Sequence, residues 1–199
     1  MGHMDYFIIF IMALVLIIGI YQFYFWCQRN AFRPAIEFSS KIDTWFTLKP
    51  HWIWIYSGLY YPIIIFMIFS FQNMRHFNYT VFSFFMLLVF QMLFFLFLPV
   101  KTPDSWRLHT QGNNLSVRFL NYVQSMDKSS NCFPSMHVSV STLTACHLFI
   151  NLPDLGYYIF LFPVIIALSA LYTKQHYFWD LLPGAGLGAL CFKLFLLIY

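Results

Sequence analysis

The sequence predicts an all-α fold: a polytopic membrane helical bundle with six transmembrane helices, forming a single membrane domain over residues 1–199. Composition is the first reason, because 60% of the 199 residues are hydrophobic, 9% are charged and the mean hydropathy is +0.68. A water-soluble domain of this length could not carry that composition without aggregating. The second reason is a count of six long apolar runs, at residues 6–27, 52–71, 79–100, 134–150, 155–172 and 179–199.

Each of these runs is expected to be a helix, because lipid offers the backbone no hydrogen-bond partners. Residues 6–27 reach the ~20 residues that a helix needs to cross a bilayer, so we interpret this run as a retained helix and not as a signal peptide. The last run carries a face of small residues that includes Gly184 and Gly188. We expect this face to pack closely against another helix of the bundle. The long polar segment 101–133 is interpreted as a loop.

The charge pattern excludes a nucleic-acid partner. The formal charge of +4 comes from scattered Lys and Arg, without the dense basic block that a nucleic-acid surface needs. The four Cys form no C-x-x-C pair and say little about the redox compartment. We expect Cys132, which lies beside a polar cluster, to be structural.

Three polar clusters are expected at one face of the membrane. One begins at Lys101, after the third run; one is residues 134–137, at the start of the fourth; the third, from Lys174 to Asp180, joins the fifth run to the sixth. If every run crosses the membrane once, all three clusters lie on the same side. This convergence predicts a functional site built from motifs between residues 101 and 180.

The residue types in these clusters favour phosphoryl transfer on a lipid. His176 and Asp180 are four apart, so on a continuous helix the carboxylate would orient the imidazole and leave its other nitrogen as nucleophile or base. Pro134, Ser135 and His137 stand at a helix start, where free N–H groups attract phosphate. The expected cations are Lys101, Arg107 and Lys174, with Arg118 and Lys128 in reserve.

Other interpretations compete with this one. The His-x-x-x-Asp pair is also found as a structural hydrogen bond, and Pro134 with Ser135 also suits a plain helix start. A metal site on His109, His137, His147 or His176 is disfavoured, because the sequence has no H-E-x-x-H and no zinc-type Cys-His spacing. His147 is ten residues beyond His137, about 15 Å along a helix, so it is not expected in the same site. A transporter with a phosphate-lined vestibule and a haem-binding electron carrier are the remaining alternatives.

These residues resemble the type 2 phosphatidic acid phosphatase superfamily of membrane lipid phosphatases and phosphotransferases. Its second motif, Pro-Ser-Gly-His, is matched by residues 134–137 with Met136 in place of Gly. Its third motif, Ser-Arg, five residues, His, three residues, Asp, is matched at Ser169, His176 and Asp180, with Ala170 in place of the Arg.

The first motif, Lys, six residues, Arg-Pro, is matched more loosely. Lys101 begins it, but Arg107 comes one residue early and no Pro follows it. The full form Cys-Phe-Pro-Ser-Met-His resembles the branch that includes inositol phosphorylceramide synthases.

The resemblance implies roles for these residues. His176 would be the nucleophile that forms a phosphohistidine, Asp180 its orienting partner and His137 the general acid. Lys101, Arg107 and Ser135 would bind phosphate, and we expect Lys174 to replace the charge missing at Ala170. The expected enzyme is a metal-independent lipid phosphatase without cofactors, acting on a phospholipid, isoprenoid or lipid A phosphate, with a lipid phosphotransferase as the main alternative.

Two arguments disagree about which side of the membrane carries the site. The segment 28–51, on the site face, carries Arg29, Arg33, Lys41 and Lys49, whereas the loop after the second run carries only Arg75. The positive-inside rule therefore places the site in the cytoplasm. The resemblance implies the extracytoplasmic face, which we prefer, because lipid-headgroup binding also places cations in such a loop.

Overall fold

The computed structural model describes residues 2–107, 112–127 and 129–199, and its regular elements are helices. Within these residues the only β-type pairings are isolated bridges that join Val100 to Ile36 and to Asn131. The α-helices are α1 (His3–Asn30), α2 (Tyr60–Phe66), α3 (Met74–Phe97), α4 (Leu115–Met126), α5 (Met136–Asn151), α6 (Leu161–Tyr172) and α7 (Phe178–Ile198). Shorter helical turns are η1 (Lys41–Trp45), η2 (Pro50–Trp52), η3 (Trp54–Leu59), η4 (Met67–Ser70), η5 (Asp104–Arg107) and η6 (Pro153–Phe160).

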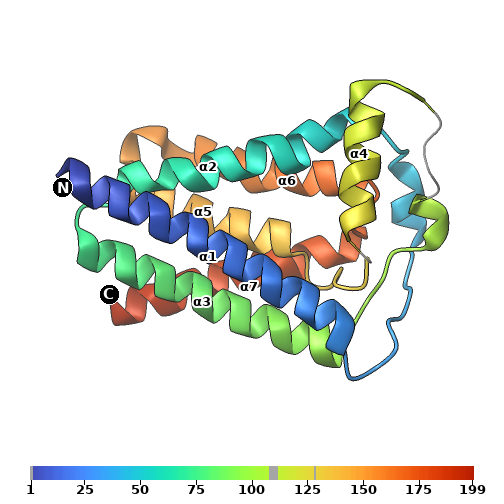
Figure 1. The fold of residues 1–199 in the computed structure, drawn as a ribbon, viewed down its shortest axis with the longest axis horizontal. Helices are drawn as coiled ribbons and strands as arrows, with labels where there is room; N and C mark the ends of the chain where they lie inside the picture. Colours follow the sequence, from blue (N-terminus) through green and yellow to red (C-terminus); the bar gives the residue numbers. More distant parts are fainter. Residues whose placement is uncertain (1, 108–111, 128) are drawn as a thin grey trace.

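All six predicted apolar runs are helical and lie side by side in one bundle (Figure 1). Five of the resulting helical segments are long and apolar enough to cross a membrane: 3–30, 50–70, 74–97, 153–172 and 178–198. The fourth run forms α5, which has 16 residues and so rises only about 24 Å. Both termini lie at the end of the bundle opposite α4, as an even number of crossings requires (Figure 1).

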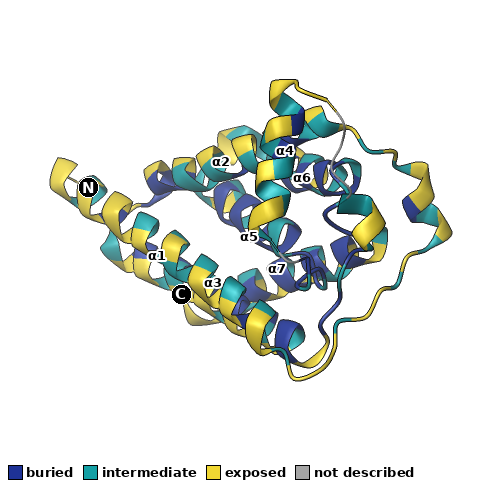
Figure 2. Cartoon of the chain, turned by 45° about the vertical axis from the view of Figure 1, so that its right-hand side comes forward, coloured by how far each residue is buried: buried dark blue, intermediate teal, exposed yellow. Residues whose placement is uncertain are grey.

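α5 is the central helix of the bundle. Most of its residues between Val138 and Leu148 are buried, whereas α1 and α3 present exposed apolar side chains on their outer faces (Figure 2). Because α5 is surrounded by protein, its length need not match the ~30 Å of hydrocarbon that lipid-facing helices must cross. The five long apolar segments make the chain an integral membrane protein, and α5 is the helix that the rest of the bundle encloses.

Small residues let α7 approach α5 closely. A Cβ added at Gly188 would lie 2.3 Å from the carbonyl oxygen of Ser139, and one at Gly184 would lie 2.7 Å from that of Ser135. This confirms the close packing predicted from the last apolar run. The Gly184 contact also fixes the start of α5, where the Pro-Ser-x-His residues lie, against the start of α7.

Hydrogen bonds between polar side chains connect α3 to α5 inside the bundle. Gln91 donates to the Ser139 hydroxyl at 2.8 Å, and the His147 Nε2 lies 3.0 Å from the Ser83 hydroxyl. Such bonds between transmembrane helices contribute about 0.6 kcal/mol each on average. They set the register of α5 against α3.

The long segment 101–133 is not a plain loop, as the sequence was interpreted. It contains α4, which crosses the site end of the bundle and buries Val117 and Leu120. Asn114 caps this helix by accepting a hydrogen bond from the Val117 N–H at 2.9 Å. The amphipathic spacing and the Asn cap are sequence signals for this helix, hidden by the low overall hydropathy of the segment.

Candidate active site

The three polar clusters meet at the end of the bundle where α4 lies. The Tyr177 hydroxyl donates to the carbonyl oxygen of Lys101 at 2.8 Å, and Arg107 Nη2 donates to Gln175 Oε1 at 3.0 Å. The Cys132 carbonyl lies 2.9 Å from the His176 Nδ1. The structure thus brings the segments around residues 101–107, 132–137 and 174–180 into contact, as the parity of the spans predicts.

His176 lies in the turn between α6 and α7 and not on a continuous helix with Asp180, so that part of the sequence interpretation was wrong. α6 ends at Tyr172, Lys174 adopts a positive φ of 56°, and α7 begins only at Phe178. The pair forms nevertheless, because Asp180 is in the first turn of α7 and its Oδ2 lies 3.4 Å from the His176 Nδ1. The carboxylate also accepts the Tyr177 N–H at 3.0 Å.

The surroundings of His176 decide which of its nitrogens is free to react. Both neighbours of Nδ1, the Cys132 carbonyl and the Asp180 carboxylate, are hydrogen-bond acceptors. Nδ1 must therefore carry the proton, which leaves a lone pair on Nε2. Because the residue is only 5% exposed, this orientation is held by packing as well as by hydrogen bonds.

His137 is the second residue of α5 and faces His176. The two rings are 6.5 Å apart between centroids, at an angle of 61°. On its other side His137 stacks on Tyr56, with centroids 4.1 Å apart and planes 25° apart, and Nδ1 lies 3.0 Å from the Tyr56 hydroxyl. Tyr60 packs against the same ring at 4.6 Å.

The two imidazoles are close enough to act on the same phosphoryl group. A nucleophile approaches the reacting atom to about 3–3.5 Å, and a general acid must come within about 2.6–3.2 Å of the oxygen that it protonates. Rings whose centroids are 6.5 Å apart are close enough for both to contact one phosphoryl group bound beside them.

Ser135 is the N-cap of α5. Its hydroxyl accepts the Val138 N–H at 3.5 Å, its own N–H donates to the Asp180 carbonyl at 3.0 Å, and the residue is fully buried. The hydroxyl hydrogen is still available as a donor. A role for Ser135 in phosphate binding stays a prediction, to which the structure adds a capping role.

Arg107 is a predicted phosphate-binding cation whose side chain contacts the residue before His176. Its guanidinium donates to the carbonyl oxygen of Asp127 at 2.6 Å and to Gln175, the residue before His176, and it is ion-paired with the Asp127 carboxylate at 3.6 Å. Guanidinium groups suit phosphate because of their forked donors. These contacts hold the charge of Arg107 beside the turn that carries His176.

Lys101 and Lys174 are held by other partners. The Lys101 ammonium is 3.1 Å from the Glu37 carboxylate, whose hydrogen bond raises the pKa of the lysine. The Lys174 ammonium donates to the carbonyl oxygen of Asp43 at 2.8 Å and lies 4.4 Å from the centre of the Trp106 ring. Burial lowers the pKa of Lys174. Phosphate binding by either lysine stays a prediction, as it does for Arg118 on α4, and Lys128 lies outside the described residues.

Among the described residues, one group of three potential metal ligands occurs: Cys132, His176 and Asp180, whose ligand atoms lie within 4.8 Å of one another. The Cys132 thiol donates to the Ser129 carbonyl at 2.9 Å, and burial and the nearby carboxylates raise its pKa. Of the other metal candidates, His137 and His147 are not part of this group, and His109 lies outside the described residues.

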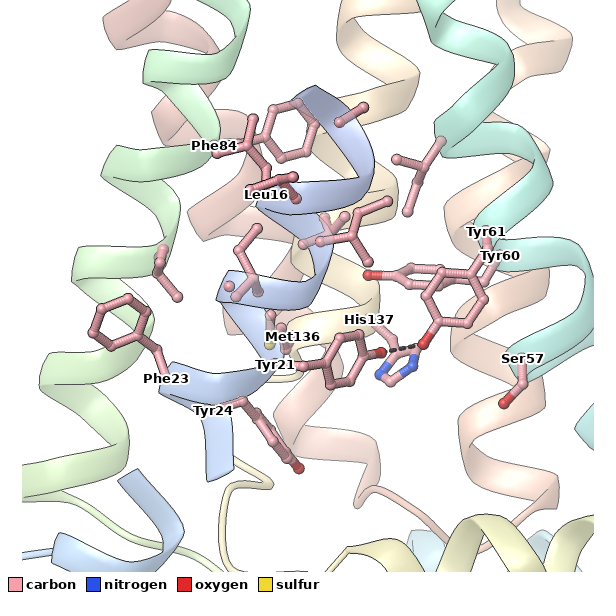
Figure 3. A pocket seen from close by; sticks show the side chains of 18 of the residues that line it. Leu16, Tyr21, Phe23, Tyr24, Ser57, Tyr60, Tyr61, Phe84, Met136 and His137 are labelled. Carbon is pink, nitrogen blue, oxygen red and sulfur yellow. Dashed lines mark hydrogen bonds between the residues drawn. The ribbon is translucent and has the colours of Figure 1, made fainter. Parts of the chain in front are cut away.

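A cavity of about 790 Å³ opens beside His137 and extends between α1, α2, α3 and α5. Figure 3 shows Tyr21, Tyr60 and Tyr61 around His137, with Leu16 and Phe84 further along the cavity. Its volume is in the range of small-molecule sites, roughly 300–1,000 Å³, and almost all of its lining is apolar or aromatic. Met136, the departure from the motif Gly, is part of the wall.

Sequence reasoning missed Tyr56, Asp43 and Asp127. Asp43 is buried and accepts the N–H of Phe178, the first residue of α7, at 2.8 Å, which fastens the segment before η2 to the helix that carries Asp180. Acidic residues are so rare in this chain that each was a candidate for a buried role. Tyr56 had no such signal, because it lies within an apolar run and is one of 13 tyrosines in the chain.

Comparison with known families decides what this site belongs to. A family model described as the PAP2 superfamily matches residues 36–194, a range that includes both imidazoles, Asp180 and all the predicted phosphate-binding residues. The chain belongs to the PAP2 superfamily. Membership implies phosphoric-ester hydrolase or transferase chemistry. Comparisons with curated proteins and with solved structures give no match.

Proposed function

We propose that this PAP2 superfamily protein is a membrane lipid phosphatase that hydrolyses a lipid phosphomonoester or diphosphate through a phosphohistidine on His176. The observation that carries the proposal is the placement of the two imidazoles 6.5 Å apart beside a cavity of about 790 Å³. The phosphate would contact both imidazole rings, and the apolar chain of the lipid would lie in the cavity. Phosphatidic acid, an isoprenyl diphosphate and lipid A all fit this description.

In the first step, the lone pair on His176 Nε2 attacks phosphorus and forms an N–P bond. The bond from phosphorus to the lipid oxygen breaks, and that oxygen takes a proton from His137 Nε2. In the second step, water attacks phosphorus and gives its proton to His137, and the N–P bond electrons return to His176. Asp180 stabilises the positive charge on the His176 ring while phosphate is attached.

Metal independence is part of the proposal, as is a role for Arg107, Lys101, Ser135 and Lys174 in holding the phosphate oxygens. It is supported by the presence of two imidazoles, which supply the nucleophile and the acid without a metal-bound water. Activity retained in EDTA after extensive chelation supports this point, and activity that returns only when a divalent cation is added back contradicts it.

A lipid phosphotransferase, which passes the phosphoryl or phospho-headgroup to an alcohol, is the second candidate. Tyr56, Tyr60, Asp127 and Gln175 line the same cavity as His137, and their polar groups are candidates to hold an acceptor hydroxyl. The resemblance of residues 132–137 to the branch that includes inositol phosphorylceramide synthases favours the same reaction.

The deciding experiment incubates the purified protein with phosphatidic acid, phosphatidylglycerol phosphate, isoprenyl diphosphate and lipid A. Free phosphate that depends on His176 supports hydrolysis. No release from any substrate, with product formed only when an alcohol is supplied, favours transfer. A His176→Ala variant that keeps full turnover overturns both. Vanadate, which mimics five-coordinate phosphorus, is expected to inhibit either reaction.

We further propose that the site faces the extracytoplasmic side. Asn113, exposed at the site end, and Gln72, exposed in the turn before α3 at the other end, are matched positions for single cysteines. The native Cys27, Cys132 and Cys191 are buried and Cys146 is half-buried, so labelling of the protein without an added cysteine sets the background. Labelling of Asn113→Cys but not Gln72→Cys in intact cells supports the assignment, and the reverse supports the positive-inside count.

A further inference from the structure

Tyr56 and His137 form a pair that the catalytic roles described above leave unexplained. The tyrosine is 5% exposed, its ring is stacked on the imidazole at 4.1 Å, and its hydroxyl lies 3.0 Å from Nδ1. Stacking fixes the plane of the imidazole and the hydrogen bond fixes its rotation within that plane. A buried side chain that makes both contacts leaves His137 one orientation, with Nε2 as the nitrogen free to meet another group.

The local backbone directs Tyr56 toward the site. Tyr56 lies in η3, where the helix widens into a π-type turn at Trp54–Leu59. Pro62 follows one turn later and lacks the N–H that would bond to the carbonyl of Gly58, which accounts for an irregular helix at this point. Single π-type turns are frequent at functional sites because they turn a side chain out of the regular helical register. Here both Tyr56 and Tyr60 pack on His137.

The chemical difference between the two histidine partners matches the different roles of the two rings. His176 is paired with the negatively charged Asp180, which favours the imidazolium that exists while phosphate is attached. His137 is paired with a neutral phenol. A phenol oxygen can accept the Nδ1–H but carries no negative charge that would stabilise the imidazolium. Nε2 can therefore release its proton to the leaving oxygen and later take one from water.

We propose that Tyr56 is a positioning residue for the general acid: its hydroxyl accepts the Nδ1–H of His137 and keeps Nε2 directed at the leaving oxygen. The inference rests on the proposed function, in which His137 is the acid. Its consequence is specific to the leaving group. Tyr56 matters where the leaving oxygen needs a proton and matters little where it does not.

The test compares Tyr56→Phe with the wild-type protein on phenyl phosphate and p-nitrophenyl phosphate. These substrates have nearly the same shape, but only the phenolate of the first leaves poorly without a proton. General acid catalysis contributes roughly 10²–10⁴-fold, and we expect Tyr56→Phe to lose about tenfold or more of kcat/KM on phenyl phosphate and less than about threefold on p-nitrophenyl phosphate. The ratio of the two values does not depend on how much of a preparation is folded.

Two controls separate the possible failures. Tyr79→Phe, on α3 at the opposite end and in ring contact with Tyr199, is expected to leave both values unchanged. His137→Ala should show the same discrimination between substrates as Tyr56→Phe, but larger. If His137→Ala discriminates and Tyr56→Phe loses activity equally on both substrates, or on neither, the role of Tyr56 is refuted. If His137→Ala does not discriminate, the general-acid role of His137 fails first.

Discussion

Replacing Asp180 by Asn tests how the nucleophile is oriented. The carboxylate Oδ2 faces both the His176 Nδ1, at 3.4 Å, and the Tyr177 N–H, at 3.0 Å. An Asn amide oxygen in the same place can accept from both, so the variant removes the charge and keeps the geometry. The Cys132 carbonyl, 2.9 Å from Nδ1, still holds the proton on that nitrogen. Asp180→Asn is therefore expected to be impaired but active.

The size of the loss follows from the kind of bond that is weakened. A hydrogen bond to a charged group contributes about 1.5–3 kcal/mol, and each 1.36 kcal/mol corresponds to about a tenfold change in rate. Turnover of Asp180→Asn should fall about 10- to 150-fold, whereas His176→Ala should be inactive.

The assay is phosphate release from the best lipid substrate in detergent micelles, with acid-stable and acid-labile ³²P on the protein measured in parallel. Phosphohistidine is acid-labile, so it should accumulate more slowly in Asp180→Asn and be absent in His176→Ala. Unchanged turnover in Asp180→Asn would show that the carboxylate only caps α7. A complete loss with unchanged thermal unfolding would show that the Cys132 carbonyl does not hold the ring.

Three further variants test the phosphate site, the cavity and the helix packing. Lys174→Ala should lower turnover at least tenfold if the Lys174 ammonium binds phosphate, and near-wild-type turnover refutes that role. Burial lowers the pKa of Lys174, so the lysine loses its charge at lower pH than usual. Lys174→Arg, which keeps its charge, should therefore extend activity to higher pH. Met136→Gly removes part of the cavity wall and should change the ratio of kcat/KM values between lipid substrates, whereas a uniform loss would indicate only a weaker helix start. Gly188→Ala should destabilise the protein by about 1–3 kcal/mol in thermal unfolding, because its Cβ would lie 2.3 Å from the Ser139 carbonyl oxygen. Gly186→Ala is the matched control, because a Cβ there would meet nothing within 4 Å. Equal stability of the two variants contradicts the packing argument.

The sequence alone determined the membrane location, the six helical runs and the face on which the polar clusters meet. These properties follow from composition and from the parity of crossings, because lipid leaves a spanning backbone no alternative to hydrogen-bonded helices. The motif residues His137, His176 and Asp180 could be selected in the same way, since ionisable groups are scarce in such a chain and costly to place near lipid. α4 was missed because an amphipathic surface helix has low average hydropathy.

Only the tertiary structure decided how each histidine is oriented. The Nδ1 partner of His176 includes a backbone carbonyl 44 residues earlier in the chain, and the partner of His137 is a tyrosine 81 residues earlier. Contacts of this kind depend on the turn after α6, the widened helix at Trp54–Leu59 and the close approach of α7 to α5 at Gly184. The spacing of residues along the sequence does not predict these contacts, because they depend on how the helices pack and not on the periodicity of any one helix.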